Sequence, residues 1–389
     1  MTRPLHLLHV FPTFSLGGSQ LRFVTLAHRL GGNFRHSVVS LDGHQEAAAL
    51  LDPGVSADLV PIFSARSIFT APFLYAKLLQ QLRPNVLQTY NWGAIDAVVG
   101  AQLAGFPSVI HTEDGFNPDE ALRLKRRRVL TRRVVLRQIF KTIMPSETLQ
   151  RIALEQYHLP ADRVQFIPNG IDVNRFQPRD GTELRARLGI GPGEFVVGAV
   201  GRLSREKNFP LLVRAFASLN WDDARLLIIG GGSEEALIRT EGENAGITSR
   251  LILTGRLADT APYYSVFDLL AISSDTEQMP LALLEAMASG CAVVSTNVGD
   301  CSAILKADGP PVIAQRGDAA TLAACIRTLR NDPTSRSRLG SANRARCLEV
   351  YPTQRMVEAY RALYEEAASQ RASRRWNMSA RKSAQPAAC

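Results

Sequence analysis

Residues 269–296 read LLAISSDTEQMPLALLEAMASGCAVVST, and this stretch contains the pattern that decides the fold. The apolar run over 269–272 predicts a buried strand, and Pro280 followed by further apolar residues predicts a helix after a short loop. Gly290 is typical of a residue that ends a helix, and the apolar run over 292–295 predicts the next strand. A strand, a helix and a strand in this order indicate a parallel sheet that helices cover on both faces.

The same alternation fills the chain on both sides of a break rich in Pro and Gly at residues 178–194. Further strands are expected at Leu5–Phe11, His36–Leu41, Asn85–Thr89, Ser108–His111, Lys141–Met144, Phe195–Val200, Arg225–Ile229 and Leu251–Leu253. A chain of 389 residues exceeds the usual size of one core, so two domains are expected. The sequence predicts two Rossmann-like domains, each an α/β sheet, with ligands beyond the carboxyl ends of the strands and both sets of loops at a shared cleft.

The predicted boundaries follow from this pattern. They are an N-terminal domain over 1–177, a linker over 178–194, a second domain over 195–350, a C-terminal helix over 351–370 and a disordered basic tail over 371–389.

The net charge of +9 is concentrated in two short segments. Residues 123–137 hold eight Lys and Arg and no acid, and residues 371–389 hold five and no acid. The rest of the chain is slightly acidic, which argues against a broad nucleic-acid surface and for local contact with something anionic. For 123–137 two interpretations stay open: contact with an anionic membrane, or a solvated helix with a few buried residues.

The five cysteines are widely spaced and form no C-x-x-C pair, which favours a reducing compartment over disulfides or a zinc site. No apolar stretch has the roughly 18 residues of a membrane span. We therefore expect a cytoplasmic protein whose membrane contact, if any, is peripheral at the inner face.

Two loops contain groups suited to phosphate. Gly17 and Gly18 follow the first strand, where glycines let the backbone approach an anion, although Ser19 as a simple N-cap is an equal alternative. Arg202 and Lys207 follow a strand of the second half and could grip a diphosphate, although a solvated charged loop has the same composition.

Two carboxylates flank the helix that begins after Pro280. Glu277 lies in the preceding loop and Glu285 lies within the helix, and carboxylates accept hydrogen bonds from sugar hydroxyls. The alternative for Glu277 is an acid favoured by the dipole of a helix N-terminus.

Together these motifs resemble those of the family 4 glycosyltransferases, which have the GT-B fold. The resemblance spans nearly the whole chain. It rests on GGSQ at 17–20, IPNGID at 167–172, GRLSREKN at 201–208, the two glutamates eight residues apart at 277 and 285, and AMASGCAVVST at 286–296. The GT-B fold implies that the C-terminal helix crosses back to the first domain.

The resemblance implies a role for each matching residue. Arg202 and Lys207 would bind the diphosphate of the donor, Glu285 its ribose and Glu277 the transferred sugar. Further donor contacts would come from Gly17, Gly18, Leu257, Met279, Pro280 and Leu281.

The family has a histidine before a glycine or aspartate in the sugar site of the first domain. This chain reads VIHTEDG at 109–115, so alignment on Gly115 selects Asp114, whereas chemistry selects His111. Both stay open as candidate catalytic residues. Gln278 and Met279 stand where the family has Gly-Phe or similar, which leaves the donor sugar open. No two aspartates are two residues apart, and with Arg202 and Lys207 available we expect no metal or other cofactor.

The function that the resemblance implies is retaining transfer of a sugar from a nucleotide sugar to a glycan or lipid-linked acceptor. Exopolysaccharide or other cell-surface polysaccharide synthesis is the expected pathway. The alternatives are a nucleotide-sugar 2-epimerase of the same fold and a non-catalytic glycosyltransferase-like binding subunit.

Overall fold

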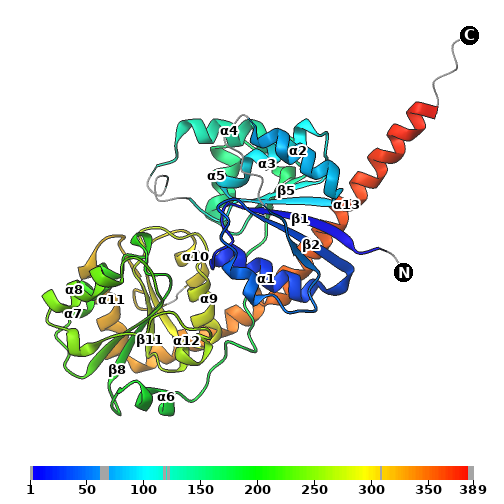
Figure 1. The fold of residues 1–389 in the computed structure, drawn as a ribbon. Coiled ribbons are helices and arrows are strands. Elements are labelled where there is room, and N and C mark those ends of the chain that lie inside the picture. The colour runs from blue at the N-terminus through cyan, green and yellow to red at the C-terminus, as the bar shows by residue number, and fades with distance from the viewer. Residues whose placement is uncertain (1–2, 62–69, 117–119, 121–122, 307–308, 384–389) are drawn as a thin grey trace, which may run out of the picture. The chain divides into compact units, whose positions relative to one another are not determined.

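The computed structural model describes residues 3–61, 70–116, 120, 123–306 and 309–383, and side chains through residue 370. The chain divides into two compact units (Figure 1). The first combines residues 1–168 with 354–389, and the second is residues 169–353. Each is a parallel sheet flanked by helices, which confirms the predicted pair of Rossmann-like domains.

The sheet of the first unit has the order β3-β2-β1-β4-β5-β6-β7 in the part of the chain that the structure describes, and all its pairings are parallel. Its strands are β1 (Leu5–Phe11), β2 (Phe34–Ser40), β3 (Ala57–Leu59), β4 (Val86–Tyr90), β5 (Val109–Thr112), β6 (Lys141–Met144) and β7 (Val164–Phe166). Its helices are α1 (Gly18–Leu30), α2 (Ala71–Leu82), α3 (Ile95–Leu103), α4 (Arg126–Leu136), α5 (Glu147–Glu155) and, from Gln354 on, α13 (Thr353–Ser383).

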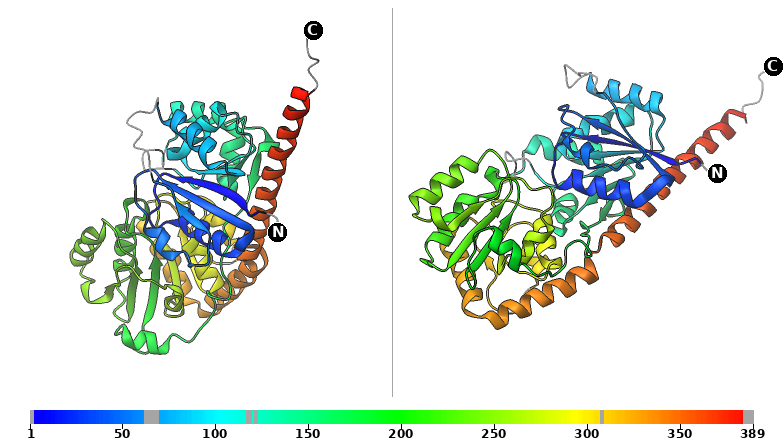
Figure 2. Two further views of the ribbon diagram at one scale, coloured as in Figure 1. Left: turned by 45° about the vertical axis from the view of Figure 1, so that its right-hand side comes forward. Right: turned by 60° about the horizontal axis from the view of Figure 1, so that its bottom comes forward.

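Alternate residues of each strand point to opposite faces of this sheet. Leu7 of β1 packs in a cluster with residues of α1 and α13, whereas Leu8 packs in a cluster with residues of α2, α3, α4 and α5. The chain's last helix is therefore a structural part of the first unit, and Figure 2 shows it running beside that unit's strands. The residues of α13 that fill this core recur at helical spacing: Met356, Tyr360, Leu363, Tyr364 and Ala367.

The second unit has the order β10-β9-β8-β11-β12-β13, again all parallel over the described residues. Its strands are β8 (Phe195–Val200), β9 (Ala224–Ile229), β10 (Leu251–Leu253), β11 (Leu269–Ile272), β12 (Ala292–Thr296) and β13 (Ile313–Ala314). Its helices are α6 (Thr182–Arg187), α7 (Phe209–Ala217), α8 (Glu235–Asn244), α9 (Leu281–Ala288), α10 (Cys301–Leu305), α11 (Ala319–Asn331) and α12 (Pro333–Val350).

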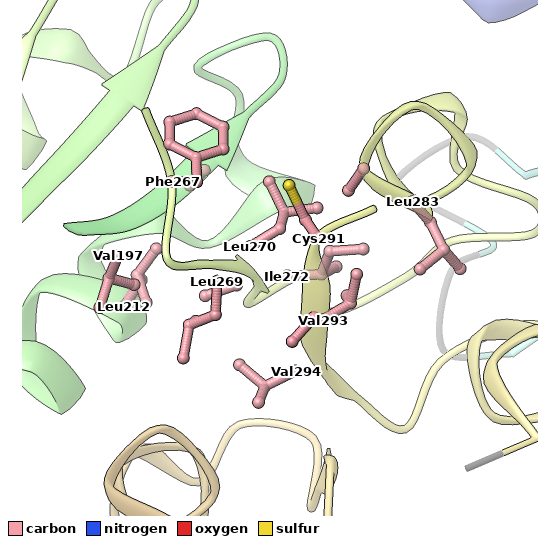
Figure 3. Packing of buried hydrophobic residues seen from close by; sticks show 14 of the residues in the cluster. Val197, Leu212, Phe267, Leu269, Leu270, Ile272, Leu283, Cys291, Val293 and Val294 are labelled. Carbon is pink, nitrogen blue, oxygen red and sulfur yellow. The ribbon is translucent and has the colours of Figure 1, made fainter. Parts of the chain in front are cut away.

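The core of the second unit is built on the stretch quoted first. Leu270 of β11 and Val293 of β12 are hydrogen-bonded neighbours in the sheet, and both are fully buried. Figure 3 shows them beside Leu283 of α9, which comes from the connection between these two strands. The predicted crossover unit is confirmed.

Two predicted boundaries are wrong. The division falls after Pro168, and the expected linker 178–194 belongs to the second unit, where it forms α6. Leu184 and Leu188 pack against the core of that unit, and Ile190 is buried in it, so this segment has too much apolar contact to be a free linker.

The predicted disorder from residue 371 is also wrong over 371–383, because α13 continues to Ser383. No Gly or Pro interrupts the sequence between Thr353 and Pro386, so nothing in its composition stops the helix earlier. The last residues of the expected tail, 384–389, lie outside the described residues.

Candidate active site

The loops that follow the strands of the second sheet all leave from one edge, because the strands are parallel. They contain residues 201–208 after β8, 230–232 after β9, 254–257 after β10 and 273–280 after β11. The predicted donor-binding residues of this unit thus come from loops at a single edge or from the helix that follows it.

Lys207 and Glu277 are in direct contact at this edge. The Lys207 ammonium binds Oε1 of Glu277, which also accepts a hydrogen bond from Oγ of Ser274 at 2.8 Å. The hydroxyl of Ser273 donates to the carbonyl of Lys207 at 2.9 Å. The structure therefore joins the predicted diphosphate cation to the predicted sugar-binding acid.

Asn208 holds the two loops together next to this ion pair. Its side-chain amide donates to both carboxylate oxygens of Asp275 at 3.1 Å, and the backbone N–H of Asp275 donates to the carbonyl of Glu206 at 2.8 Å. Asn208 adopts a left-handed conformation at φ 46° and also caps α7 through Oδ1. This fixed contact orients Lys207, its neighbour in the chain.

Arg202 lies in the same loop but does not contact Lys207 or Glu277 in this structure. Its side chain is 66% exposed, and Nη2 lies 3.1 Å from Oε1 of Glu206. Burial favours the neutral acid, but hydrogen bonds from Ser204 and Arg202 outweigh it and lower the pKa of Glu206. Arg202 thus lies at the same edge of the sheet as Lys207, and its side chain pairs with Glu206.

Two glycines that sequence reasoning did not single out allow these loops to approach each other. A Cβ at Gly230, where φ is +149°, would lie 1.8 Å from the carbonyl oxygen of Gly201. A Cβ at Gly299, where φ is +51°, would lie 2.3 Å from the carbonyl oxygen of Glu277. The Gly-Gly-Gly run at 230–232, directly after a strand, was the available signal in the sequence.

Glu285 lies on α9, where Tyr264 directs its carboxylate. The buried Tyr264 hydroxyl donates to Oε2 at 2.5 Å. Burial raises the pKa of Glu285, although the hydrogen bond from Tyr264 opposes the shift. Arg175 and Asp259 form an exposed ion pair nearby, with an N–O distance of 2.7 Å. The charge of Arg175 lowers the pKa of Glu285, and the charge of Asp259 raises it. Tyr264 is a second site residue that the sequence analysis missed.

The segment between the two glutamates is held by the IPNGID motif. The Asn169 side-chain amide donates to the carbonyl of Met279 at 3.1 Å, and the Met279 side chain is buried. Pro280 directly precedes α9, whose first residue is Leu281, as predicted. Leu257, another predicted donor contact, follows β10 at the same edge and packs partly buried against the core.

In the first unit, Gly17 is the N-cap of α1 and Gly18 is its first residue, so both lie between β1 and α1 as predicted. The carbonyl of Gly17 accepts the N–H of Leu21 at 2.9 Å. The hydroxyl of Ser19 donates to the side chain of Gln20, and no side-chain cap of α1 is present. The simple N-cap interpretation of Ser19 is therefore wrong.

His111 and Asp114, the two alternatives for the family histidine, occupy different environments. His111 lies within β5 with no exposed surface, and Nδ1 is 2.8 Å from the Thr89 hydroxyl oxygen. His111 thus presents no exposed surface to a substrate, which favours Asp114 over His111 as the candidate. Asp114 follows the strand at the carboxyl edge, keeps 16% of its side chain exposed and binds Arg22 through both oxygens.

The basic segment 123–137 is partly neutralised inside the first unit. Arg132 is buried and donates to Glu113 at 2.8 and 3.0 Å, while Arg128 donates to Glu120 at 2.8 Å. Burial favours the neutral acid, but Arg132 outweighs it and lowers the pKa of Glu113. The helix thus has a buried, charge-compensated face.

The opposite face of α4 is exposed and mixes charge with apolar side chains. Leu130 and Val134 are each 58% exposed, and Arg126, Arg127 and Arg137 are exposed around them. The buried residues fit a solvated helix with a few buried residues, and contact of 123–137 with a membrane stays a prediction. None of the helices in the described part of the chain has the length and hydropathy needed to cross a bilayer.

Comparisons with known proteins cover both units. Residues 16–175 match the model of the family described as Glycosyltransferase Family 4, and residues 180–346 match that described as Glycosyl transferases group 1. A D-inositol 3-phosphate glycosyltransferase of Nocardia farcinica is 34% identical over 205 residues, which is 49% of this chain and 45% of the relative. An alpha-monoglucosyldiacylglycerol synthase of Streptococcus pneumoniae is 31% identical over 169 residues, 41% of this chain and 38% of the relative.

These matches span about half, or less, of each curated relative's length. Among solved structures, Anabaena HepE in complex with UDP superimposes with a TM-score of 0.81 at 19% identity, covering 93% of this chain and all of that one. At this identity the likeness shows the fold. Since the two family models together match most of the chain, the protein belongs to the family 4 glycosyltransferases and has the GT-B fold.

Proposed function

We propose that this protein is a retaining glycosyltransferase that moves a sugar from a nucleotide sugar to a hydroxyl of a glycan or lipid-linked acceptor. The observation that carries the proposal is the contact of Lys207 with Glu277 at the carboxyl edge of the second sheet. This contact supports the proposal because a cation suited to a diphosphate lies beside a carboxylate suited to sugar hydroxyls, and transfer from a sugar diphosphate needs both.

The donor would lie along the loops of the second unit. Lys207 and Arg202 would balance the charge that develops on the diphosphate as it leaves. Glu285, oriented by Tyr264, would accept hydrogen bonds from the ribose, and Glu277 would accept them from the transferred sugar. The UDP in the solved structure of Anabaena HepE supports this class of donor and says nothing about which sugar this chain uses.

The reaction breaks the bond between the anomeric carbon and the diphosphate oxygen and forms a bond from that carbon to the acceptor oxygen. The acceptor's proton passes to the leaving phosphate oxygen on the same face, which gives retention. The products are the glycoside and a nucleoside diphosphate, so no oxidant or reductant is needed. The absence of a cofactor requirement stays a prediction.

Release of nucleoside diphosphate from a panel of nucleotide sugars, with and without acceptors, tests the proposal. We expect one donor to support acceptor-dependent release, and proton NMR of the product to show the donor's anomeric configuration. Inversion would overturn the retaining mechanism. Formation of an epimerised sugar without transfer would favour the 2-epimerase, and no turnover of any donor would favour a binding subunit.

For the acceptor, we propose a lipid-linked glycan of a cell-surface polysaccharide such as exopolysaccharide, met at an anionic membrane. The exposed face of α4, with Arg126, Arg127 and Arg137 around Leu130 and Val134, supports this. Lys and Arg near an anionic surface contribute about 1 kcal/mol each, and exposed apolar side chains add burial in the interface. Arg128 and Arg132 are excluded from this estimate because Glu113 and Glu120 compensate them.

Sedimentation with vesicles of phosphatidylcholine, with or without 30% phosphatidylglycerol, tests the membrane contact. We expect binding only to the anionic vesicles, and a several-fold weaker affinity after Leu130→Ser or Arg127→Glu. Leu154→Ser and Arg151→Glu on α5 are matched controls with exposed side chains, and they should bind like the wild type. Equal recovery with both vesicle types would overturn the membrane contact and leave the transfer reaction untouched.

A further inference from the structure

Arg22 and Asp114 form a two-pronged ion pair at the edge of the first sheet. Nη1 of Arg22 lies 2.5 Å from Oδ1 of Asp114, and Nη2 lies 2.8 Å from Oδ2. Arg22 comes from the second turn of α1, the helix that begins at Gly18, and Asp114 lies two residues beyond β5. A parallel pair of N–H···O bonds fixes both the distance and the plane of the carboxylate.

Asp114 is also held through its backbone. Its N–H donates to Oδ1 of Asn91 at 2.7 Å, and the N–H of Asn91 donates to the carbonyl of Thr112 at 2.8 Å. Asn91 follows β4 and adopts a left-handed conformation at φ 56°, which asparagine tolerates better than most residues. The ends of β4 and β5 and the start of α1 thus converge on one carboxylate.

The two partners differ in exposure. The Arg22 side chain is 3% exposed and lies near the ring of Tyr360 from α13, whereas the Asp114 side chain is 16% exposed. Burial disfavours a charged guanidinium, but the charge of Asp114 outweighs it and raises the pKa of Arg22. The cation therefore lies beneath the carboxylate, and the carboxylate forms the outer surface.

We propose that Arg22 is a positioning residue that holds the Asp114 carboxylate in place and fixes its orientation, so that Asp114 accepts a hydrogen bond from a sugar hydroxyl. A carboxylate has about four lone-pair sites, and the guanidinium occupies one on each oxygen. The remaining sites can receive a hydroxyl proton in a hydrogen bond, while the charge is compensated from behind. Asp114 is thus a hydrogen-bond acceptor and not the base that removes the acceptor's proton.

The location of the pair argues for this role over a purely structural one. A buried ion pair is weak support for stability, because an apolar pair of similar volume often does as well. Here the pair lies at the edge that also presents Gly17 and Gly18, and its acidic member is the more exposed one. The proposal rests on the proposed glycosyltransferase function, because it names the group that receives a sugar hydroxyl in that reaction.

Four variants distinguish a positioning role of Arg22 from a structural role. They are Arg22→Met, Asp114→Asn, Arg22→Met/Asp114→Asn and Arg22→Lys. We expect Arg22→Met to lower Tm, because it leaves a carboxylate unbalanced, and to lower kcat/KM for transfer by roughly 100-fold. Asp114→Asn should lose activity to a similar extent. The double variant should regain most of the Tm and none of the activity. Arg22→Lys keeps the charge but loses the fork, so its activity should fall between those of the wild type and Arg22→Met.

Binding of the nucleoside diphosphate alone, measured by calorimetry, should be unchanged in all four variants, because the side chains proposed to bind it, Arg202, Lys207 and Glu285, lie in the second unit. Arg35→Met is the matched control, since it breaks an Arg–Asp pair of the same unit whose partners are both more than half exposed, and it should behave like the wild type. If the double variant regains activity together with Tm, Arg22 and Asp114 are only structural and the proposal is overturned. A wild type that turns over no nucleotide sugar would instead contradict the proposed function.

Discussion

Lys207 and Glu277 lie 70 residues apart in the chain and form an ion pair at the carboxyl edge of the second sheet. Glu277 is 11% exposed and Lys207 is 25% exposed, so both side chains are set before a donor arrives. Pre-placed charges cost no reorganisation when negative charge develops on a leaving group.

Lys207→Ala should lower kcat/KM for transfer by about 100- to 1,000-fold, the usual effect of removing one group that stabilises developing charge. Nucleoside diphosphate release measures the rate, and a thermal melt should show a small loss of Tm because Glu277 loses its cation. Arg205→Ala removes a positive charge from the same loop at an exposed position and is the control. If kcat/KM falls equally in the two variants, the positive charge of the loop as a whole, and not a specific contact of Lys207, affects the donor.

Glu285→Gln should stabilise the protein at neutral pH while weakening donor binding. Burial raises the pKa of Glu285 in the folded state, so ionisation opposes folding once the pH exceeds 4.5, the pKa of an ordinary glutamate. The Tm advantage of the variant should therefore be absent below this pH and grow as the pH rises through the raised pKa.

The expected loss of donor binding in Glu285→Gln has a different cause from the gain in stability. A hydrogen bond to a charged group contributes about 1.5–3 kcal/mol, so affinity for the nucleoside diphosphate should fall roughly 10- to 100-fold in calorimetry. Glu183→Gln, at an exposed position of the same unit, should change neither quantity. An unchanged affinity in Glu285→Gln would remove Glu285 from the ribose site.

Acid should destabilise the first unit through a buried histidine pair. Nε2 of His9 lies 3.0 Å from Nδ1 of His36, and Nδ1 of His9 lies 3.1 Å from the Tyr90 hydroxyl. Burial and the nearby His6 lower the pKa of His36 to about 4, so the unfolded chain binds a proton at a higher pH than the folded one. Stability is then complete above pH 6.5 and falls as the pH drops from 6.5 to 4, by roughly 3 kcal/mol.

Hydrogen exchange of peptides from β1 and β2, measured across this pH range, reports that loss. His36→Gln cannot take up the proton and should flatten the pH dependence. His44→Gln, in an exposed loop, should retain it. If hydrogen exchange depends on pH in the same way in both variants, the acid sensitivity comes from a group other than His36.

The sheets were largely predictable from sequence, but three of the four edge strands in the described part of the chain, β3, β7 and β13, were not predicted. β1, β6, β8, β10 and β11 have the bounds that their apolar runs predicted. β3 was missed because Ala57–Leu59 is short and mostly exposed, so no apolar run marks it. α12 was missed because its sequence is rich in Ser and Arg and few of its residues reach the core.

The candidate site was also predictable only in part. The positions of Lys207, Glu277 and Glu285 followed from motifs that lie next to recognisable strands. The pairing of Arg22 with Asp114 could not be predicted, because 92 residues separate them and only the strand order brings them together. The burial of His111 could not be predicted either, because the sequence did not show that β5 continues through it to Thr112.

Removal of α13 should unfold the first unit and spare the second. A chain ending at Pro352 lacks Met356, Tyr360, Tyr364 and Ala367, whose burial covers one face of the first sheet. Hydrogen exchange should then show unprotected β1 and β4 beside protected β8 and β11. A chain ending at residue 370 keeps these contacts and should melt like the full-length protein. Protection of β1 in the shorter chain would contradict this role of α13.

The two units also differ in when they can be completed as the polypeptide is synthesised. The second unit is one continuous segment, so its sheet can close while the last helix is still within the ribosome. The first unit begins the chain but lacks one layer of its core until residues near Ala367 emerge. The unit whose strands are made first is therefore finished last, and a nascent chain must keep the apolar face of its first sheet from aggregating until α13 has emerged.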